Sequence, residues 1–306
     1  KELKERIASV VVGQEQTVDL VLTAVLANGH VLIEGVPGVA KTLLARLTAR
    51  LIDADFSRVQ FTPDLMPSDV LGTTVFNMKT NGFDFHQGPI FADIVLVDEI
   101  NRAPAKTQAA LFEVMEERQI SIDGTTHRMG DLYTILATQN PVEQEGTYKL
   151  PEAQLDRFLM KITMDYPSLE EEVNILERHH TNAALVKLDD IVPAITKEEL
   201  LSLRAFMNQV FVDRTLLQYI ALIVQQTRTS KAVYLGASPR ASVAMLQSSK
   251  AYALLQGRDF VTPEDIKFVA PYVLQHRLIL TAEAEMEGYS PVKVTQRLID
   301  KVEVPK

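Results

Sequence analysis

Cysteine is absent from this chain of 306 residues. Without cysteine the protein forms neither disulfide bonds nor thiolate metal sites, and we expect a cytoplasmic location. Long apolar runs are also missing. No run approaches the ~18 residues that a membrane-spanning helix needs, because the most apolar stretch, residues 21–33, is interrupted by Thr23, Asn28, Gly29 and His30. We therefore expect no membrane span.

The chain has no excess of positive charge. Its 31 lysines and arginines stand against 40 aspartates and glutamates, so that the net charge is −9. Sequence-independent binding of DNA or RNA depends on cations that neutralise phosphates, and we therefore expect no nucleic-acid partner. A hydrophobic content of 46% and a charged content of 23% are typical of a soluble globular protein. The length favours about two domains.

The most informative motif in the sequence is a glycine-containing turn at residues 35–38. Residues 31–34 have the pattern of a buried strand, and leucines at helical spacing begin at Leu43. A strand, a glycine loop and a helix start are the context of a phosphate-binding loop, or P-loop, whose backbone N–H groups surround a phosphate. The residues expected to bind nucleotide here are Gly35, Val36, Pro37, Gly38, Val39, Ala40, Lys41, Thr42 and Leu43.

Two side chains of this loop have predicted chemical roles. Lys41 is expected to reach the β- and γ-phosphates, and the Thr42 hydroxyl is expected to bind Mg²⁺. The loop departs from the pattern G-x-x-x-x-G-K-[ST] at Ala40, which stands in place of the second glycine. Alanine is small and suits the first turn of a helix, so we expect phosphate contact to be kept. The alternative is an ordinary strand–turn–helix with an exposed lysine.

A second motif follows four consecutive aliphatic residues, 94–97, which predict a strand buried on both faces. Asp98 and Glu99 come directly after it, and carboxylates at a buried strand end need a counter-charge or solvent. We expect Asp98 to hold Mg²⁺, through water, and Glu99 to orient or deprotonate the attacking water. Taken alone, such an acidic pair is more often a solvated loop.

Two hairpins are predicted on either side of this strand. The first spans 73–87 with Asn81-Gly82 at its turn, and the second spans 119–128 with Asp123-Gly124. Asn-Gly and Asp-Gly between alternating segments are strong hairpin signals. Each alone would be a plain surface hairpin, but two on one domain suggest dedicated insertions.

The composition changes after residue 166, which divides the chain into an α/β domain, 1–166, and a helical domain, 167–306. In the second domain, serine or threonine followed by proline is typical of helix starts. Such pairs occur at Ser238-Pro239, Thr262-Pro263 and Ser290-Pro291. The segments expected to form strands in the first domain are 31–34, 57–61, 94–97, 132–138 and 159–163.

Five motifs occur in a fixed order, and together they resemble the AAA+ ATPases. Ala40 and the two hairpins make the chain similar to the MoxR family in particular. The resemblance covers nearly the whole chain, from about Val11 to Arg277. The motifs are Gly35–Thr42, Asp98–Ala103, Ala137–Pro141, Gln154–Phe158 and Ser238–Arg240.

The resemblance implies an α/β fold in which helices sandwich a five-stranded parallel P-loop (AAA+) sheet. Two β-hairpin insertions and an all-helical C-terminal lid domain complete the expected fold. It also implies that the chain assembles with copies of itself into a ring, commonly a hexamer. The cofactors that it implies are ATP and Mg²⁺, with ATP bound between subunits.

Further site residues follow from the resemblance. Asn140 corresponds to the sensor that positions the hydrolytic water, and Arg157 to an arginine finger that reaches the neighbouring subunit's γ-phosphate. Arg240 corresponds to the lid arginine that contacts the phosphate of its own subunit. Val12-Gly13 matches the segment that lines the adenine pocket, and Arg102 is a weaker candidate for a second arginine acting on the neighbour.

The residues themselves leave alternatives open for three of these assignments. Arg157 has local acidic neighbours, Asp156 and Glu152, with which it could form an ion pair. Arg240 is interpreted as a solvated surface arginine if no phosphate binds there. Asn140 precedes a proline and is alternatively a capping residue.

The function implied by the MoxR resemblance is that of an ATP-driven chaperone that remodels client proteins. Such proteins mature enzyme complexes or insert metal cofactors, often with a partner that contains a von Willebrand factor A domain. A magnesium-chelatase-like motor subunit shares the hairpins and is one alternative. A nucleic-acid motor and a nucleotide-dependent scaffold without turnover are the others.

Overall fold

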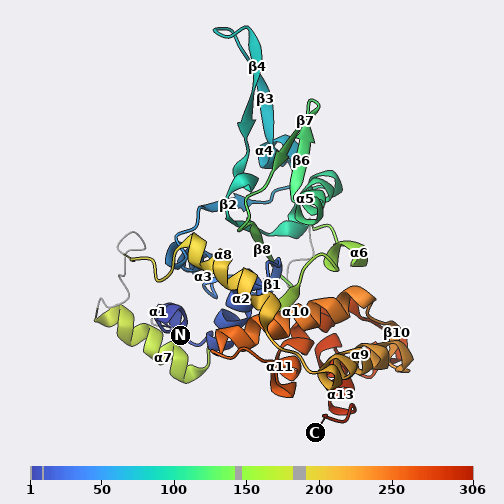
Figure 1. Ribbon diagram of the computed structural model, residues 1–306. Helices are drawn as coiled ribbons and strands as arrows, with labels where there is room; N and C mark the ends of the chain where they lie inside the picture. Colours follow the sequence, from blue (N-terminus) through green and yellow to red (C-terminus); the bar gives the residue numbers. More distant parts are fainter. Residues whose placement is uncertain (1, 9, 142–146, 182–190, 306) are drawn as a thin grey trace.

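A five-stranded parallel sheet lies at the centre of the first domain in the computed structural model, which describes residues 2–8, 10–141, 147–181 and 191–305 (Figure 1). The strand order is β2-β5-β8-β1-β9, and every neighbouring pair is parallel. The predicted parallel sheet is therefore confirmed. Its strands are β1 (Val31–Gly35), β2 (Phe56–Gln60), β5 (Ile94–Asp98), β8 (Thr134–Gln139) and β9 (Met160–Met164).

Strand β5 shows why the sheet is buried on both faces. All of its residues are buried, and alternate side chains enter different hydrophobic clusters. Ile94 and Leu96 pack with leucines of helices α2 (Glu15–Leu26) and α3 (Lys41–Leu51). Val95 and Val97 pack on the other face with helix α5 (Ala105–Glu117). Successive side chains of a strand point to opposite faces of the sheet, so the four aliphatic residues of β5 contribute to two hydrophobic cores.

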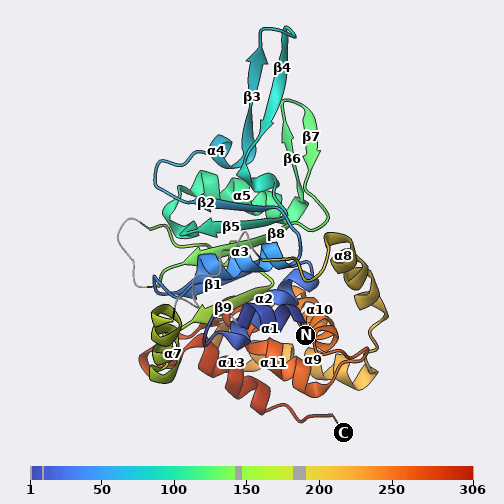
Figure 2. The same ribbon diagram turned by 90° about the vertical axis from the view of Figure 1, so that its left-hand side faces the viewer.

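Both predicted hairpins are present and extend from the sheet in the same direction (Figures 1 and 2). The longer one pairs β3 (Gly72–Asn77) with β4 (Gly82–Gln87), and the shorter one pairs β6 (Gln119–Ile122) with β7 (Thr125–Arg128). Asn81 and Asp123 have positive φ angles of 52° and 51° in the two turns. Asn and Asp tolerate this left-handed conformation, which accounts for the turn signal in the sequence.

The remaining elements of the first domain are short. They are helices α1 (Glu2–Ala8), α4 (Pro67–Leu71) and α6 (Glu152–Leu155) and the 3₁₀ turns η1 (Pro89–Phe91) and η2 (Ile100–Arg102).

The region after β9 is largely helical, as predicted. Two short antiparallel strands, β10 (Val233–Leu235) and β11 (Ile279–Leu280), were not predicted. The helical elements are α7 (Leu169–His180), α8 (Lys197–Phe206), η4 (Met207–Gln209), α9 (Arg214–Thr229), α10 (Pro239–Leu255), α11 (Pro263–Leu274), η5 (Gln275–Arg277), α12 (Ala282–Met286) and α13 (Pro291–Asp300). In the described part of the chain, no helix combines the length and hydropathy required of a membrane span.

Helix α8 follows the predicted domain boundary in sequence but packs on the first domain (Figure 2). Lys197 Nζ lies 2.6 Å from an Asp93 carboxylate oxygen, just before β5. Arg204 donates to the Val25 carbonyl oxygen at 2.6 Å, near the end of α2. Lys197 and Arg204 thus attach this helix to the sheet domain, although the helix follows residue 166 in the sequence.

Candidate functional site

The predicted phosphate loop connects the end of β1 to the start of α3. A Cβ on Gly35 would lie 2.7 Å from the Met164 carbonyl oxygen, so the close approach of β9 requires glycine there. Gly38 has space around it but a φ of +88°, which glycine adopts without strain. Ala40 is the N-cap of α3 with a φ of 61°, and helix α3 begins only at Lys41. The expectation that Ala40 lies in the first helical turn is therefore wrong. An alanine in this left-handed conformation costs about 1–2 kcal/mol.

The two polar side chains of the loop lie at the N-terminus of α3. Lys41 Nζ donates a hydrogen bond of 2.5 Å to the carbonyl oxygen of Gly35, so its side chain folds back across the loop. Thr42 follows in the first helical turn and is half-buried. A helix N-terminus presents unpaired N–H groups and partial positive charge, which together with an ammonium group suit an anion.

Asp98 ends β5 and is buried, with 7% of its surface exposed. Its Oδ2 accepts a 2.6 Å hydrogen bond from Arg58 Nε on β2, and its Oδ1 accepts one of 3.0 Å from the Thr138 hydroxyl on β8. The carboxylate is thus held from both neighbouring strands. Arg58 was not found by sequence analysis, because only the β2–β5 pairing brings it next to Asp98.

Glu99 has a left-handed backbone with a φ of 56°. Strain of this kind costs about 1–3 kcal/mol and is concentrated at functional sites. Its carboxylate accepts a 2.7 Å hydrogen bond from Gln60 Nε2 and lies 3.0 Å from Arg102 Nε. Arg102, a candidate for action on a neighbouring subunit, therefore pairs with Glu99 of its own chain in this structure.

Asn140 follows β8 directly and is buried. Ala137 of β8 lies opposite Val97 of β5, so that the two strands end side by side. Asn140 and Glu99 consequently project from the same edge of the sheet, here called the carboxyl edge. Ligands of open α/β sheets gather at such an edge.

The carboxyl edge carries oxygen atoms of the kinds that bind Mg²⁺. Asp98 and Thr42 supply a carboxylate and a hydroxyl, which are ligands that Mg²⁺ prefers. Within the residues that the structure describes, no group of three or more His, Cys, Asp or Glu could hold a metal by itself. Mg²⁺ is usually bound by one or two carboxylates together with substrate phosphates and water.

The predicted adenine segment lines a cleft of about 510 Å³. Val12 and Gly13 form one side, and Glu171 and Asn174 of α7 form the other. A Cβ on Gly13 would lie 2.5 Å from the Glu171 side chain, and Gly13 has a φ of +71°. The Glu171 carboxylate can move aside, so it is the left-handed backbone that favours glycine here. The α7 wall was not predicted, since nothing in its sequence distinguishes it from a solvated helix face.

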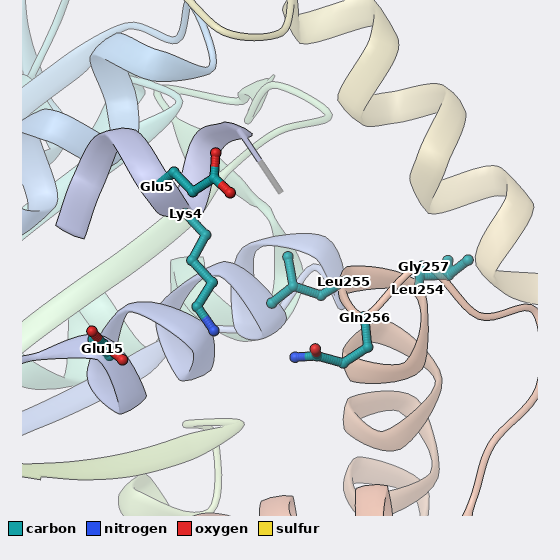
Figure 3. A pocket seen from close by; sticks show the side chains of 7 residues that line it. All are labelled: Lys4, Glu5, Glu15, Leu254, Leu255, Gln256 and Gly257. Atoms are coloured by element: carbon teal, nitrogen blue, oxygen red, sulfur yellow. The ribbon is translucent and has the colours of Figure 1, made fainter. Parts of the chain in front are cut away.

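Another cleft, of about 570 Å³, lies between α1, α2 and the end of α10 (Figure 3). Lys4 and Gln256 extend toward the same space in this view. Lys4 forms an ion pair of 2.7 Å with Asp19. None of the predicted site residues lines this cleft.

Arg157 and Arg240 meet at one carboxylate. Arg157 Nη2 lies 2.8 Å from Oε2 of Glu116, and Arg240 Nη2 donates to Oε1 of the same side chain at 2.8 Å. The hydrogen bond from Arg240, with the charge of Arg157, holds the pKa of the Glu116 carboxyl below its ordinary value. Arg157 thus pairs with neither Asp156 nor Glu152, the partners suggested by the sequence.

The position of Glu116 decides what these arginines can reach. Glu116 lies in the last turn of α5, and Arg118 directly after α5 donates to the carbonyl oxygens of Asn28 and Tyr133. Those residues precede β1 and β8, so Glu116 and the two arginines lie at the amino edge of the sheet. This edge is a strand length, ~16 Å, from the phosphate loop. Arg240 thus pairs with Glu116 in this structure, and its contact with the phosphate of its own subunit stays a prediction.

A buried ion pair fixes the segment that carries Arg157. Arg277 in η5, with a side chain 4% exposed, donates to Asp156 Oδ1 at 2.6 Å and to the Phe158 carbonyl oxygen at 2.8 Å. The helical domain therefore holds the residues on both sides of Arg157. Neither Arg277 nor Glu116 was found by sequence analysis.

Comparisons with known proteins show the family to which this chain is similar. Residues 30–160 match the family model "ATPase family associated with various cellular activities (AAA)", and residues 225–300 match an AAA lid domain. The chain is 44% identical to Chaperone MoxR1 of Mycobacterium tuberculosis, over 97% of this chain and 80% of that protein. It is 48% identical to the uncharacterized protein YeaC of Bacillus subtilis, over 98% and 93%.

A further relative and a solved structure extend the comparison. Protein MoxR of Methylorubrum extorquens is 30% identical over 92% of this chain and 88% of its own length. The crystal structure of a candidate ATPase from Cytophaga hutchinsonii superposes with a TM-score of 0.91 at 41% identity. The match covers 100% of this chain and 94% of that one.

Proposed function

The chain belongs to the MoxR family of AAA+ ATPases, and we propose that it couples ATP hydrolysis to the remodelling of client proteins. The similarity to Chaperone MoxR1 supports a chaperone-like role. We propose further that the client is a protein complex under maturation or metal insertion in the cytoplasm. A protein with a von Willebrand factor A domain is the partner that we propose for delivering this client.

The observation that carries the proposal is the convergence of three strand ends on one edge of the sheet. Gly35 ends β1, Asp98 ends β5 and Asn140 follows β8, and these strands are adjacent in the sheet. Anion-binding N–H groups, metal-binding oxygens and a polar side chain therefore face a common space. That combination is what Mg·ATP hydrolysis requires.

Each group at this edge has a proposed task. Lys41 and the loop N–H groups bind the β- and γ-phosphates, while Thr42 and Asp98 hold Mg²⁺. When bound, Mg²⁺ neutralises charge on the phosphate oxygens. Glu99 accepts the proton of the attacking water, and Asn140 orients that water. Gln60 and Arg102 hold the Glu99 carboxylate in place.

The amino edge completes the site of a neighbouring copy. Because Arg157 and Arg240 lie a strand length from their own phosphate loop, we propose that both act on the nucleotide of the next subunit. The resulting assembly is a ring, which we propose to be a hexamer. Glu116 keeps the two guanidinium groups together until a γ-phosphate replaces it as their anionic partner.

The test compares steady-state ATPase of the unaltered protein with that of the Glu99→Gln variant. We expect a fall of about 10²–10⁴-fold, the usual contribution of a general base, with nucleotide affinity retained. Glu283→Gln, which changes an exposed glutamate in α12, is the matched control and should keep full activity. Equal rates for Glu99→Gln and the control would contradict the assignment.

The chaperone role has a separate test. Glu99→Gln loaded with ATP is expected to retain its client, which mass spectrometry then identifies after affinity capture. The capture should require ATP and should be strongly reduced with Lys41→Ala, in which we expect ATP binding to be weakened. Identical sets of captured proteins for the two variants would contradict ATP-dependent client binding.

A further inference from the structure

An apolar stripe runs along one side of α7. Tyr166, just before the helix, is 71% exposed, and Leu169, Val173 and Leu176 are 81%, 46% and 65% exposed. The spacing of four and three residues places the last three on one helix face. We call these four residues the α7 stripe. Another part of the same helix lines the candidate adenine cleft, so the stripe lies beside the nucleotide half of the site.

A second apolar surface lies on the opposite side of the molecule, at β10 (Figure 1). Tyr234 is 79% exposed and Leu235 is 51% exposed, and we call this pair the β10 patch. Beside it is a groove of about 430 Å³ to which Leu235, Ala153 and Ile279 contribute apolar atoms. Asp156, the neighbour of Arg157 in sequence, also lines this groove, so the patch lies beside the arginine half of the site.

The two surfaces are suited to each other in polarity and charge. Large exposed apolar side chains that gather at one place on a protein surface mark interaction sites. The α7 stripe is flanked by the exposed carboxylates of Glu170 and Glu172, while the exposed cation Lys231 lies close to the β10 patch in sequence. Glu152 also lines the adjoining groove. The carboxylates beside the stripe are therefore complementary in charge to Lys231 beside the patch.

We propose that the α7 stripe of one subunit docks on the β10 patch and the adjoining groove of the next copy of this chain. The inference rests on the proposed composite site. If the arginine half of one copy meets the nucleotide half of another, the surfaces beside those halves are brought close to each other. Because the two surfaces differ, the contact is heterologous and repeats from copy to copy, which generates a ring when the rotation closes.

The test uses two variants that each destroy one surface. The stripe variant carries Leu169→Glu and Leu176→Glu, and the patch variant carries Tyr234→Glu and Leu235→Glu. All four positions are exposed, so the fold is expected to persist, and a fluorescent ATP analogue checks that the stripe variant still binds nucleotide. Met78→Glu, at a residue 87% exposed near the tip of the β3–β4 hairpin, is the matched control.

Sedimentation velocity with Mg·ATP measures assembly, and steady-state turnover measures the composite site. We expect the control to assemble like the unaltered protein. Each double variant alone should sediment as a monomer and lose about 10³-fold in turnover, because no arginine reaches a neighbour's nucleotide. Mixed in equal amounts, the two variants should form a pair through their remaining intact surfaces and regain turnover at one site per pair.

The outcomes separate this inference from the function on which it rests. Assembly of either double variant like the control, or a mixture that stays monomeric, overturns the docking of stripe on patch. A pair that forms without regaining turnover supports the docking but contradicts the action of Arg157 on the neighbour. Should the stripe variant lose nucleotide binding, the milder Leu169→Ser replaces it, and normal assembly of that variant overturns the inference.

Discussion

The two edges of the same sheet are built in different ways. At the carboxyl edge, Asp98 ends a strand and Glu99 and Asn140 each directly follow one, so the parallel sheet brings them together. At the amino edge, Glu116, Arg157 and Arg240 come from α5, the segment before β9 and α10. Their meeting depends on the packing of helices distant in sequence. Strand order alone therefore explains why the residues of the carboxyl edge meet, but it does not explain why those of the amino edge meet.

The edges also differ in what they offer a ligand. The carboxylates at the carboxyl edge are held by Arg58, Gln60 and Arg102, alongside a loop suited to anions. Two guanidinium groups at the amino edge share the single carboxylate of Glu116. One edge thus suits a metal–nucleotide complex, whereas the other suits an additional phosphate. Variants of the phosphate loop at the carboxyl edge should accordingly lower both nucleotide affinity and turnover, whereas variants at the amino edge should lower turnover alone.

Arg157→Ala should have the largest effect. An arginine finger contributes about 10³–10⁵-fold to phosphoryl transfer, so turnover should fall by that factor, while ATP affinity stays unchanged because the phosphate loop lies at the other edge. Steady-state ATPase and a fluorescent-nucleotide titration measure the two quantities. Arg214→Ala, at an exposed arginine that starts α9, is the control. Loss of nucleotide affinity in Arg157→Ala would contradict the separation of the edges.

Lys41→Ala should lower turnover by about 10²–10³-fold, the usual cost of removing one preorganised charge-stabilising group, and should also weaken ATP binding. The same titration shows the weakening. Mixing Lys41→Ala with Arg157→Ala sharpens the comparison, since the intact loop of one variant then faces the intact arginine of the other. Turnover of the mixture should exceed that of either variant alone, and a mixture as inactive as its components would argue against a shared site.

Arg240→Ala should have a smaller effect. Loss of one hydrogen bond to a charged group costs about 1.5–3 kcal/mol, or roughly 10–100-fold in turnover. Because Arg240 lies at the amino edge, ATP affinity should remain, and Arg240→Lys should restore part of the rate. A weakened ATP affinity in Arg240→Ala would instead support contact within its own subunit.

The smallest effect concerns stability at the amino edge, where His30 is buried. Its Nδ1 accepts from the Ile135 N–H at 3.0 Å, and its Nε2 donates to the Met115 carbonyl oxygen at 3.1 Å. Burial, followed by the charge of Arg118, lowers the pKa of His30 to about 3. The unfolded imidazole binds a proton near pH 6.5 but the folded one does not. The free energy of unfolding should therefore fall by about 1.4 kcal/mol per pH unit below that value.

Urea unfolding at pH 7 and pH 5 measures this dependence. His30→Gln removes the titrating group. On acidification, the free energy of unfolding of this variant should therefore fall by about 1.4 kcal/mol per pH unit less than that of the unaltered protein. The buried His276, whose pKa burial also lowers, is present in both proteins and cancels in the comparison. An equal loss of stability on acidification in both proteins would contradict the role of His30.

Much of the fold could be predicted from local signals. The aliphatic run before Asp98 predicted a strand buried on both faces, and Asn81-Gly82 predicted a hairpin, because both signals act within a few residues. The strands β10 and β11 were missed, since they are short and pair across more than 40 intervening residues. Ala40 was placed in a helix on its size alone, whereas its left-handed backbone is imposed by the loop.

The sequence by itself determined which groups lie at the carboxyl edge of the sheet. Parallel strands all point the same way, so residues that follow them must share one edge. Only the tertiary structure decided that Arg240 joins Arg157 on Glu116, and that the α7 stripe and the β10 patch lie on opposite sides. Those positions depend on how helices pack, and the packing of distant helices leaves no local pattern in the chain.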